Sequence, residues 1–479
     1  MKTIFQHSTP GRQSPYQDKP ELKPETYLPA GLIRGTLPDL PRVSELDVVR
    51  HFTRLSRRNF GVDSNFYPLG SCTMKYNPKF TEHIASLPGF TDLHPLLPQL
   101  KGAGLYTQGA LQVIYELEDL LCRITGMYAY TLQPMAGAHG ELTGAMLMAA
   151  YHNKKGNQKK TIIVPDSAHG TNPSSAAIAG YDVLTIKSKN GIIDPTALRE
   201  ALNDQVAGIM MTCPNTLGLF ETHLPEIVEL IHAVDGLLYY DGANLNAILG
   251  RMLPGEAGFD VVHLNLHKTF GTPHGSGGPG SGPVGVNKKL EPFLPVSRVV
   301  RLEDGQFFLN YDYPDSIGYI APFYGNFGVM LKAYAYILRL GRQGLLRVSE
   351  NAVLSANYLR KKLEDHLDIP YNRLCMHEFV ASAVNQAQKG VRAVDIAKAL
   401  LDKGHYAPTV YFPLIVKECL MIEPTETESK ETLDIFIDDM LDILMKIESD
   451  PGEITRSPVN TPVSRLDEVL AARSMRLCG

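Results

Sequence analysis

Lys268 lies between an apolar run and a glycine-rich segment, in the stretch DVVHLNLHKTFGTPHGSGGPGSGPVG at residues 260–285. Six glycines follow the lysine between residues 271 and 282: Gly271, Gly275, Gly277, Gly278, Gly280 and Gly282. Glycine lets the main chain turn sharply or approach a ligand closely. The amine could therefore attach a ligand, although a surface lysine beside a loop would give the same pattern.

A second candidate is the stretch QPMAGAHGELTGAM at residues 133–146, in which small residues from Ala136 to Gly140 lead into a predicted helix. The first N–H groups of a helix are unpaired and carry partial positive charge. Small residues allow an anion to reach them. The stretch therefore predicts a cradle for a phosphate group, although a tight turn before a helix is the simpler alternative.

Two further polar residues follow predicted strands. Asp241 comes after the strand at 236–240, and His169 comes after the strand at 161–165. Lys268 follows a third strand, at 260–266. Because ligands of open α/β sheets bind at the carboxyl ends of the strands, we expect these side chains to face one site.

The combination of a lysine, an acid, a histidine and a phosphate cradle matches what pyridoxal 5'-phosphate requires. The lysine amine can condense with the cofactor's aldehyde, and the acid can keep the pyridine nitrogen protonated. A flat histidine can stack on the ring. We therefore expect catalytic roles for Lys268, Asp241 and His169, which would also bind the cofactor.

The elements that position these residues are apolar strands separated by helices. Strands are predicted at 160–166, 182–187, 207–213, 236–242 and 260–266, and helices at 172–181, 194–204 and 225–234. Asp194 is the predicted N-cap of the second helix, with Pro195 at its first position. This alternation predicts right-handed βαβ units and a mostly parallel sheet covered on both faces.

The pattern changes toward both ends of the chain. Residues 1–60 are rich in proline and charge, and predict an extended arm followed by one helix at 43–59. Long helical stretches at 326–367 and 429–450, with a strand at 372–383, predict a second domain. We therefore expect an arm at 1–60, a large cofactor-binding α/β domain at 61–335 and a smaller α+β domain at 336–479.

Composition excludes several classes of function. The 479 residues carry a formal net charge of -5 and are 44% hydrophobic, with no basic block for nucleic acid and no run long enough to span a membrane. Six scattered cysteines without a C-x-x-C pair favour reduced thiols, and the N-terminus lacks the apolar core of a signal peptide. We expect a cytoplasmic protein.

The short motifs HGE at 139–141 and HE at 377–378 lack the second histidine of H-E-x-x-H, so no metal site is predicted.

Several longer stretches resemble one family. NFYPLGSCTMKYNPK at 65–79, TCPNTLGLFE at 212–221, YYDGANLNAI at 239–248 and APTVYFPLIVKECLMIEPTETESK at 407–430 are similar to the P-protein, the glycine dehydrogenase (decarboxylating) of the glycine cleavage system. So are QPMAGAHGE and NLHKTFGTPHGSGGPGSGP. The length resembles the second subunit of the two-chain form. Within the resemblance, Lys268 falls on the lysine that carries the cofactor, in an aminotransferase-like fold of type I.

The resemblance implies the remaining assignments. Besides Lys268, Asp241 and His169, the cofactor-binding residues would be Ala138, His139, Thr216, Ala243 and His267. His267 and the apolar residues before it would keep the Lys268 amine reactive near neutral pH.

The resemblance also implies a reaction and partners. Glycine would lose CO2, and its aminomethyl group would pass to the lipoyl arm of the H-protein. A first subunit would complete a heterotetramer with two copies of each chain. Two alternatives stay open: another fold type I enzyme, such as an amino-acid decarboxylase or a desulfurase, and a non-catalytic scaffold subunit.

Overall fold

The computed structural model describes residues 2–12, 23–36, 38–100, 103–275 and 279–475, so Gly277, Gly278 and Cys478 lie outside the described residues. The chain divides into two compact units, Met1–Gly61 and Val62–Gly479. In the first unit the predicted helix is α2, Glu45–Ser56. Ser44 caps α2 because its hydroxyl oxygen accepts a hydrogen bond of 3.2 Å from the backbone N–H of Asp47. The same unit contains the short helix α1, Pro24–Tyr27.

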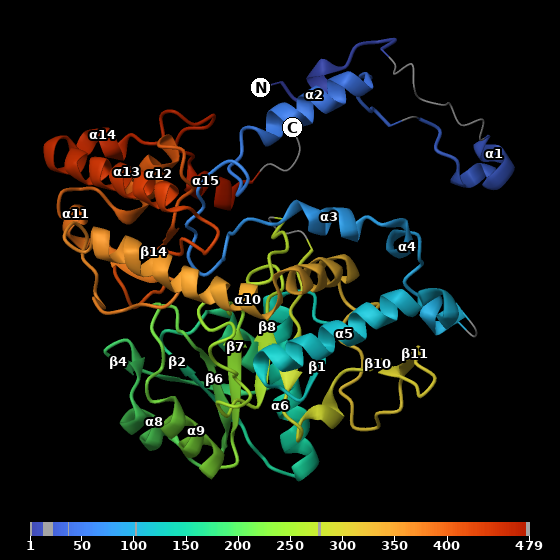
Figure 1. Ribbon diagram of the computed structural model, residues 1–479. Helices are drawn as coiled ribbons and strands as arrows, with labels where there is room; N and C mark the ends of the chain where they lie inside the picture. The colour runs from blue at the N-terminus through green and yellow to red at the C-terminus, as the bar shows by residue number, and fades with distance from the viewer. Residues whose placement is uncertain (1, 13–22, 37, 101–102, 276–278, 476–479) are drawn as a thin grey trace. The chain divides into compact units, whose positions relative to one another are not determined.

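The second unit is built on a seven-stranded sheet in the order β1-β9-β8-β7-β6-β2-β3 (Figure 1). Neighbouring strands are parallel from β8 through β7, β6 and β2 to β3, whereas β9 runs antiparallel to both β8 and β1. The mostly parallel sheet is confirmed. Its strands are β1 Ala129–Thr131, β2 Thr161–Pro165, β3 Asp182–Ile186, β6 Val206–Thr212, β7 Leu237–Gly242, β8 Val261–Leu264 and β9 Val284–Val286.

Helices cover both faces of this sheet. Because alternate residues of each strand point to opposite sides, each strand can contribute to a buried cluster on either face. Along β7, Leu238 and Tyr240 belong to one buried cluster, whereas Leu237 and Tyr239 belong to another. The first cluster includes residues of α5, α8, α9 and α10, and the second includes residues of α6 and α7. These helices are α5 Gln108–Thr125, α6 Gly137–Lys155, α7 Thr171–Ile178, α8 Pro195–Ala201, α9 Leu224–Ala233 and α10 Phe327–Leu363.

Local capping follows the sequence at α8. The carboxylate of Asp194 accepts a hydrogen bond of 3.0 Å from the N–H of Thr196, and Pro195 occupies the first helical position.

Cys213, directly after β6, is buried in the core. Burial raises the pKa of its thiol to about 12, so the residue packs as a small apolar group.

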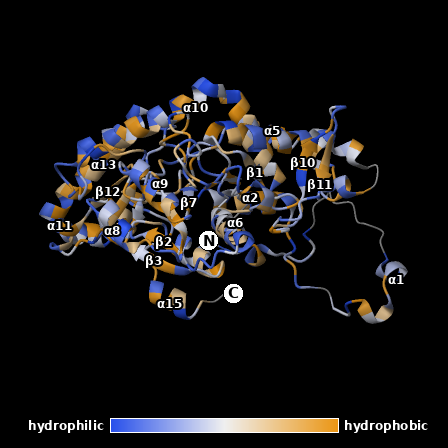
Figure 2. Cartoon of the chain, turned by 90° about the horizontal axis from the view of Figure 1, so that it is seen from below, coloured by the Kyte–Doolittle hydropathy of each residue, from blue (hydrophilic) through white to orange (hydrophobic). Residues whose placement is uncertain are grey.

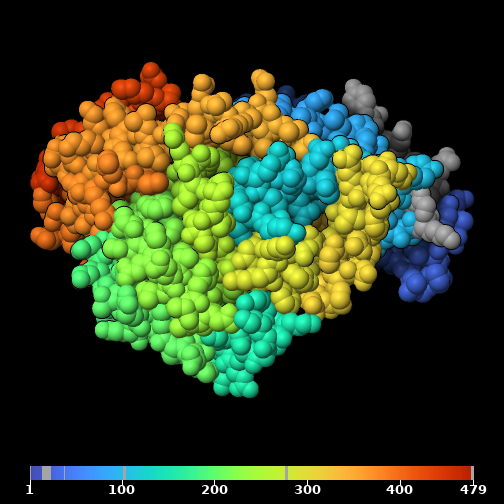
Figure 3. All heavy atoms as spheres, turned by 60° about the horizontal axis from the view of Figure 1, so that its bottom comes forward, coloured from blue at the N-terminus to red at the C-terminus, as the bar shows by residue number. Residues whose placement is uncertain are grey.

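The C-terminal region has its own three-stranded antiparallel sheet, in the order β12-β14-β13, and a separate buried cluster. Helix α10 contacts α3, α5 and α13, and Figures 1 and 2 show it as a long element with mixed hydrophobic and hydrophilic positions. Figure 3 shows the orange C-terminal residues packed directly against the green residues of the central region. The elements are β12 Phe379–Ser382, β13 Thr409–Val410, β14 Cys419–Ile422, α3 Lys79–Ala85, α12 Ala393–Asp402 and α13 Lys430–Ser449.

Two features differ from the simplest sequence pattern. Strands β1 and β9, each of three residues, were not predicted and close one edge of the sheet. The helix predicted at 326–367 is interrupted at Gly341, whose φ of 59° and ψ of -176° are not helical. The domain boundary placed between residues 335 and 336 stays a prediction. No helix among the described residues combines the length and the apolarity that crossing a bilayer demands.

Candidate active site

A cavity of about 220 Å³ lies at the carboxyl ends of the parallel strands. Its wall is drawn from segments far apart in the sequence, from residue 71 to residue 378. The described lining residues are Ser71, Gly137, Ala138, Glu141, His169, Thr171, Thr212, Pro214, Thr216, Asp241, Ala243, Asn244, Asn265, Lys268, His377 and Glu378. Six of the eight residues predicted to form the site therefore meet in one place.

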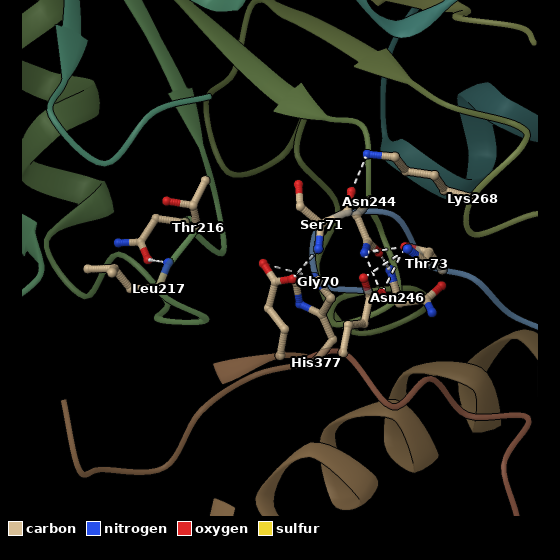
Figure 4. Close-up of polar contacts among 12 residues, drawn as sticks. Gly70, Ser71, Thr73, Thr216, Leu217, Asn244, Asn246, Lys268 and His377 are labelled. Carbon is tan, nitrogen blue, oxygen red and sulfur yellow. Dashed lines mark hydrogen bonds and ion pairs between the residues drawn. The ribbon is translucent and has the colours of Figure 1, made fainter. Parts of the chain in front are cut away.

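Lys268 follows β8 and reaches toward the segment at Ser71 (Figure 4). Its Nζ donates a hydrogen bond of 2.7 Å to the carbonyl oxygen of Ser71. The N–H of Ser71 donates in turn to Oε2 of Glu378, at 2.8 Å. Ser71 can present both groups because its φ of 67° places it in the left-handed region, which non-glycine residues rarely adopt. A single residue thus links the lysine to the C-terminal region.

Asp241 ends β7 and is buried, with 4% of its surface exposed. Its Oδ2 accepts a hydrogen bond of 2.9 Å from the side-chain amide of Asn172, and its Oδ1 accepts one of 3.2 Å from the N–H of Ala243. Nδ1 of His263 lies 3.6 Å from Oδ1. Burial by itself would raise the pKa of Asp241, but His263, the Asn172 hydrogen bond and the charge of Lys268 outweigh it, so the pKa is lowered. The carboxylate is held in its charged form.

Glu141, near the start of α6, is a second acid at the same cavity. It is 4% exposed, and its Oε2 has no hydrogen-bond partner among the described residues. Burial, followed by the charge of Asp241, raises the pKa of Glu141 to about 7. The sequence pattern predicted no role for Glu141 in the site.

The N-terminus of α6 lies where the phosphate cradle is predicted. The helix begins at Gly137, and its first intrahelical bond of 2.9 Å runs from the N–H of Gly140 to the carbonyl of Ala136. The N–H groups before Gly140 are therefore free of that ladder. A Cβ at Gly282 would overlap the Ala136 carbonyl, which explains why the glycine-rich segment can pass so close to the cradle.

The histidine and threonine predicted at the cavity are both present in its wall. The ring of His169 is held by a hydrogen bond of 2.8 Å between its Nδ1 and the hydroxyl of Thr171. Burial, with Lys268 as a smaller contribution, lowers the pKa of His169 and favours a neutral ring. The hydroxyl of Thr216 already donates a hydrogen bond of 2.5 Å to the carbonyl of Ser167.

His139 and His267 are not among the described lining residues. Nδ1 of His139 accepts a hydrogen bond of 3.2 Å from the N–H of Met135, within the turn that opens α6. Burial first, and then His274 and Lys268, lower the pKa of His267 to about 3. Its imidazole is neutral near pH 7 and adds no positive charge beside Lys268.

Two glutamates of the C-terminal region, Glu378 in the cavity wall and Glu423 near it, were not predicted. Oε1 of Glu423 accepts hydrogen bonds from the hydroxyl of Thr73, at 2.8 Å, and from the amide of Asn244, at 2.8 Å. Glu378 lies close by, and burial together with the charge of Glu423 raises its pKa well above the ordinary value. Side-chain ligand atoms of His377, Glu378 and Glu423 lie within 4.8 Å of one another. Because protein donors already occupy oxygens of both glutamates, we assign no metal there, and the prediction of no metal stays a prediction.

The residues of the C-terminal region were not predicted to belong to the site for a common reason. His377, Glu378 and Glu423 flank short strands of the C-terminal sheet, and no spacing relates them to Lys268. The one available signal was acidity inside otherwise apolar strands: HEFVAS at 377–382 and CLMIE at 419–423 each carry a glutamate at the boundary of a buried run.

Comparisons with known proteins agree over almost the whole chain. The family model for the glycine cleavage system P-protein matches residues 28–305, and that for the C-terminal domain of glycine dehydrogenase matches residues 348–461. A relative from Caldanaerobacter subterraneus subsp. tengcongensis is 58% identical, with 98% of this chain and 97% of the relative covered. One from Listeria monocytogenes serotype 4b is 55% identical, with 99% and 97% covered. Both are named probable glycine dehydrogenase (decarboxylating) subunit 2.

Solved structures agree in fold. A crystal structure of glycine decarboxylase, the P-protein of the glycine cleavage system, in inhibitor-bound form matches with a TM-score of 0.71 at 19% identity, covering 87% of this chain and 94% of that one. An alanine–glyoxylate aminotransferase from Nostoc sp. matches with a TM-score of 0.57 at 15% identity, covering 82% and 98%. The aminotransferase-like fold of type I is thereby confirmed.

Proposed function

Because this chain belongs to the glycine cleavage system P-protein family, we propose that it decarboxylates glycine and passes the remaining aminomethyl group to the lipoyl arm of a carrier, the H-protein. The chain would act as a pyridoxal 5'-phosphate-dependent glycine dehydrogenase (aminomethyl-transferring). The observation that carries the proposal is the meeting of Lys268, Asp241 and the N-terminus of α6 at one buried cavity.

The residues present fit this cofactor. Lys268 supplies a primary amine, and the free N–H groups at the start of α6 would bind a phosphate. Two buried polar atoms at the cavity, Oε2 of Glu141 and Oδ1 of Asn265, have no partner among the described residues and are available to a polar ligand. When bound, pyridoxal 5'-phosphate supplies an aldehyde that attaches to the lysine and a ring that withdraws electrons from the bond to be broken.

The chain's own groups would then bind and orient the reactants. Asp241, kept charged by Asn172 and Ala243, would hold a proton on a ring nitrogen placed beside it. His169, fixed by its bond to Thr171, would lie against a ring face. Thr216 would contribute mainly through its position, since its hydroxyl is bound to Ser167. The roles of His139 and His267 would be to support the cradle and the Lys268 segment from outside the cavity.

The partners follow from the same proposal. The relatives' name, subunit 2, supports a first subunit, which we propose forms a heterotetramer with two copies of each chain. Glycine and the lipoylated H-protein would be the substrates. A cytoplasmic location is proposed from the sequence alone.

The experiment is an exchange assay on protein co-expressed with the candidate first subunit. Labelled bicarbonate should enter the carboxyl group of glycine, and the rate should rise when the lipoylated carrier is added. Decarboxylation of a larger amino acid, or desulfuration of cysteine, without carrier or partner would favour a self-sufficient fold type I enzyme. A colourless protein that borohydride does not modify at Lys268 would favour a scaffold.

A further inference from the structure

Lys75 is a lysine buried inside the second unit, with 2% of its surface exposed, at a place where the proposed reaction has no use for a cation. Its Nζ donates hydrogen bonds to the carbonyl oxygen of Thr269, at 2.5 Å, and to the hydroxyl of Tyr336, at 3.1 Å. Nζ also forms an ion pair of 2.6 Å with Oε1 of Glu426. One ammonium group thus joins four segments of the chain, including α10 and the residue that follows Lys268.

Burying such a group is costly, and the cost has to be offset by contacts. Burial alone would lower the pKa of Lys75, but the charge of Glu426 and the contact with Tyr336 raise it, so the ammonium stays charged. The side chain of Glu426 is itself 7% exposed. Replacing both charges by apolar groups of similar shape is often neutral for stability, whereas removing one leaves an unpaired buried charge. The pair therefore calls for an explanation beyond stability.

The contacts of Thr269 supply that explanation. Its carbonyl accepts the bond from Lys75, and its hydroxyl accepts a hydrogen bond of 2.8 Å from the N–H of Leu245. Leu245 belongs to the loop that follows Asp241. The other oxygen of Glu426 accepts a hydrogen bond of 3.1 Å from the amide of Asn246 in the same loop. The pair thus fixes the loop after Asp241 and the segment after Lys268 to each other.

The Lys75–Glu426 pair also joins residues 73–76 to the segment at 423–427, and two neighbouring residues strengthen this connection. Thr73 bonds to Glu423 through its N–H, at 2.9 Å, as well as through its hydroxyl. The N–H of Tyr76 donates to the hydroxyl of Thr427 at 3.2 Å. Figure 4 shows Thr73, Asn244 and Asn246 gathered below Lys268. The connection holds the Ser71 carbonyl, which accepts the bond from Lys268, on the same framework.

We propose that Lys75 and Glu426 are positioning residues that set where Lys268 projects relative to Asp241, by fixing the main chain at Thr269 and at Asn246. Neither residue touches the cavity. The inference rests on the proposed role of Lys268 as the point of cofactor attachment, and it concerns the rigidity of this segment rather than the chemistry.

The test compares Lys75→Met, Glu426→Gln and the double variant Lys75→Met/Glu426→Gln with wild type. The double variant guards against a folding failure, because it leaves no unpaired charge in the interior. Lys79→Met is the matched control, since Lys79 lies in the same stretch but pairs with Asp63 at the surface, where both side chains are more than half exposed. Hydrogen exchange is measured without cofactor on peptides covering residues 243–247 and 265–271. Attachment is measured by borohydride trapping at Lys268 after addition of pyridoxal 5'-phosphate.

In the double variant we expect exchange in these two peptides to be at least ten-fold faster, with peptides from β2 and β6 unchanged. Trapping at Lys268 should be at least ten-fold slower, and the pH at which the attached cofactor changes colour should shift. The control should match wild type in every measurement. A folded double variant with wild-type exchange and wild-type trapping would overturn the inference. If wild type itself is not trapped at Lys268, the proposed function fails, and the exchange data still decide whether this pair orders the segment.

Discussion

The side-chain amide of Asn172 donates a hydrogen bond of 2.9 Å to Oδ2 of Asp241, and both residues are buried. Asn172 lies in the first turn of α7, on the segment that also carries His169, whereas Asp241 ends β7. The bond therefore connects α7 to the end of β7, two elements that contribute residues to the candidate site. It also favours the charged form of the carboxylate.

Changing Asp241 to Asn should leave the cofactor bound and slow decarboxylation by about 100-fold or more, because the neutral amide cannot hold a proton on the ring nitrogen. Cofactor content from absorbance and turnover from the exchange assay check this. Turnover equal to that of wild type would remove the role assigned to Asp241.

Changing Asn172 to Ala should have a smaller effect in the same direction. A hydrogen bond to a charged group is worth about 1.5–3 kcal/mol, so we expect a loss of roughly ten-fold or somewhat more in turnover. The pKa of Asp241 is lowered in the wild type partly by this bond. The acidic limb of the pH–rate profile should therefore move to higher pH in the variant. An unmoved limb would show that the bond does not tune the carboxylate.

Changing Lys268 to Ala should abolish covalent attachment of the cofactor and all turnover, while the thermal unfolding midpoint stays within a few degrees of wild type. The side chain makes one hydrogen bond among those described for it, to the Ser71 carbonyl, and borders a cavity, so its loss opens no void in the core. Mass mapping after borohydride treatment checks the attachment. Lys79→Ala, at the surface, is the control and should retain both colour and activity.

The stability of the chain should depend on pH through Glu141. Burial raises the pKa of Glu141 to about 7 from an ordinary value of 4.5. The folded chain therefore binds a proton more tightly than the unfolded chain, and stability falls as pH rises from about 4.5 to about 7. Glu141→Gln lacks this loss, so its free energy of unfolding relative to wild type should increase by on the order of 2 kcal/mol between pH 5 and pH 8.

Denaturant unfolding at both pH values measures this change. The matched control is Glu226→Gln, because Glu226 is a partly exposed carboxylate that pairs with Arg199 at the surface. A difference between Glu141→Gln and wild type that is the same at pH 5 and pH 8 would contradict the assignment.

Changing Gly218 to Ala should destabilise the chain by about 3 kcal/mol. Gly218 has a φ of 74°, and a Cβ there would overlap the carbonyl oxygen of Glu378. Both the left-handed backbone and the steric overlap oppose a side chain. Gly390→Ala is the control, because Gly390 has a φ of 82° but no atom within 4 Å of its Cβ position. That variant should lose only about 1 kcal/mol, and equal losses in the two variants would show that the contact with Glu378 yields easily.

Much of the fold was predictable because its causes are local. Buried runs such as residues 161–165 and 237–242 alternate with helices, and Asp194 with Pro195 correctly predicted where one helix begins. Strands β1 and β9 were not predicted, because a strand of three residues shows too little periodicity to be recognised. The interruption of α10 at Gly341 was not predicted, because an isolated glycine inside a helical pattern is often tolerated.

The sequence by itself determined the family, the fold, and the residues that meet at the ends of the strands, since motif and strand order place Lys268, Asp241 and the start of α6 without knowledge of distant contacts. Only the tertiary structure decided what surrounds them. The Ser71 carbonyl, Glu378, Glu423 and the Lys75–Glu426 pair come from segments hundreds of residues apart, and the burial that sets the pKa of Glu141 and of His267 exists only once the chain has packed. Charge and proximity are properties of the folded arrangement, and no local pattern encodes them.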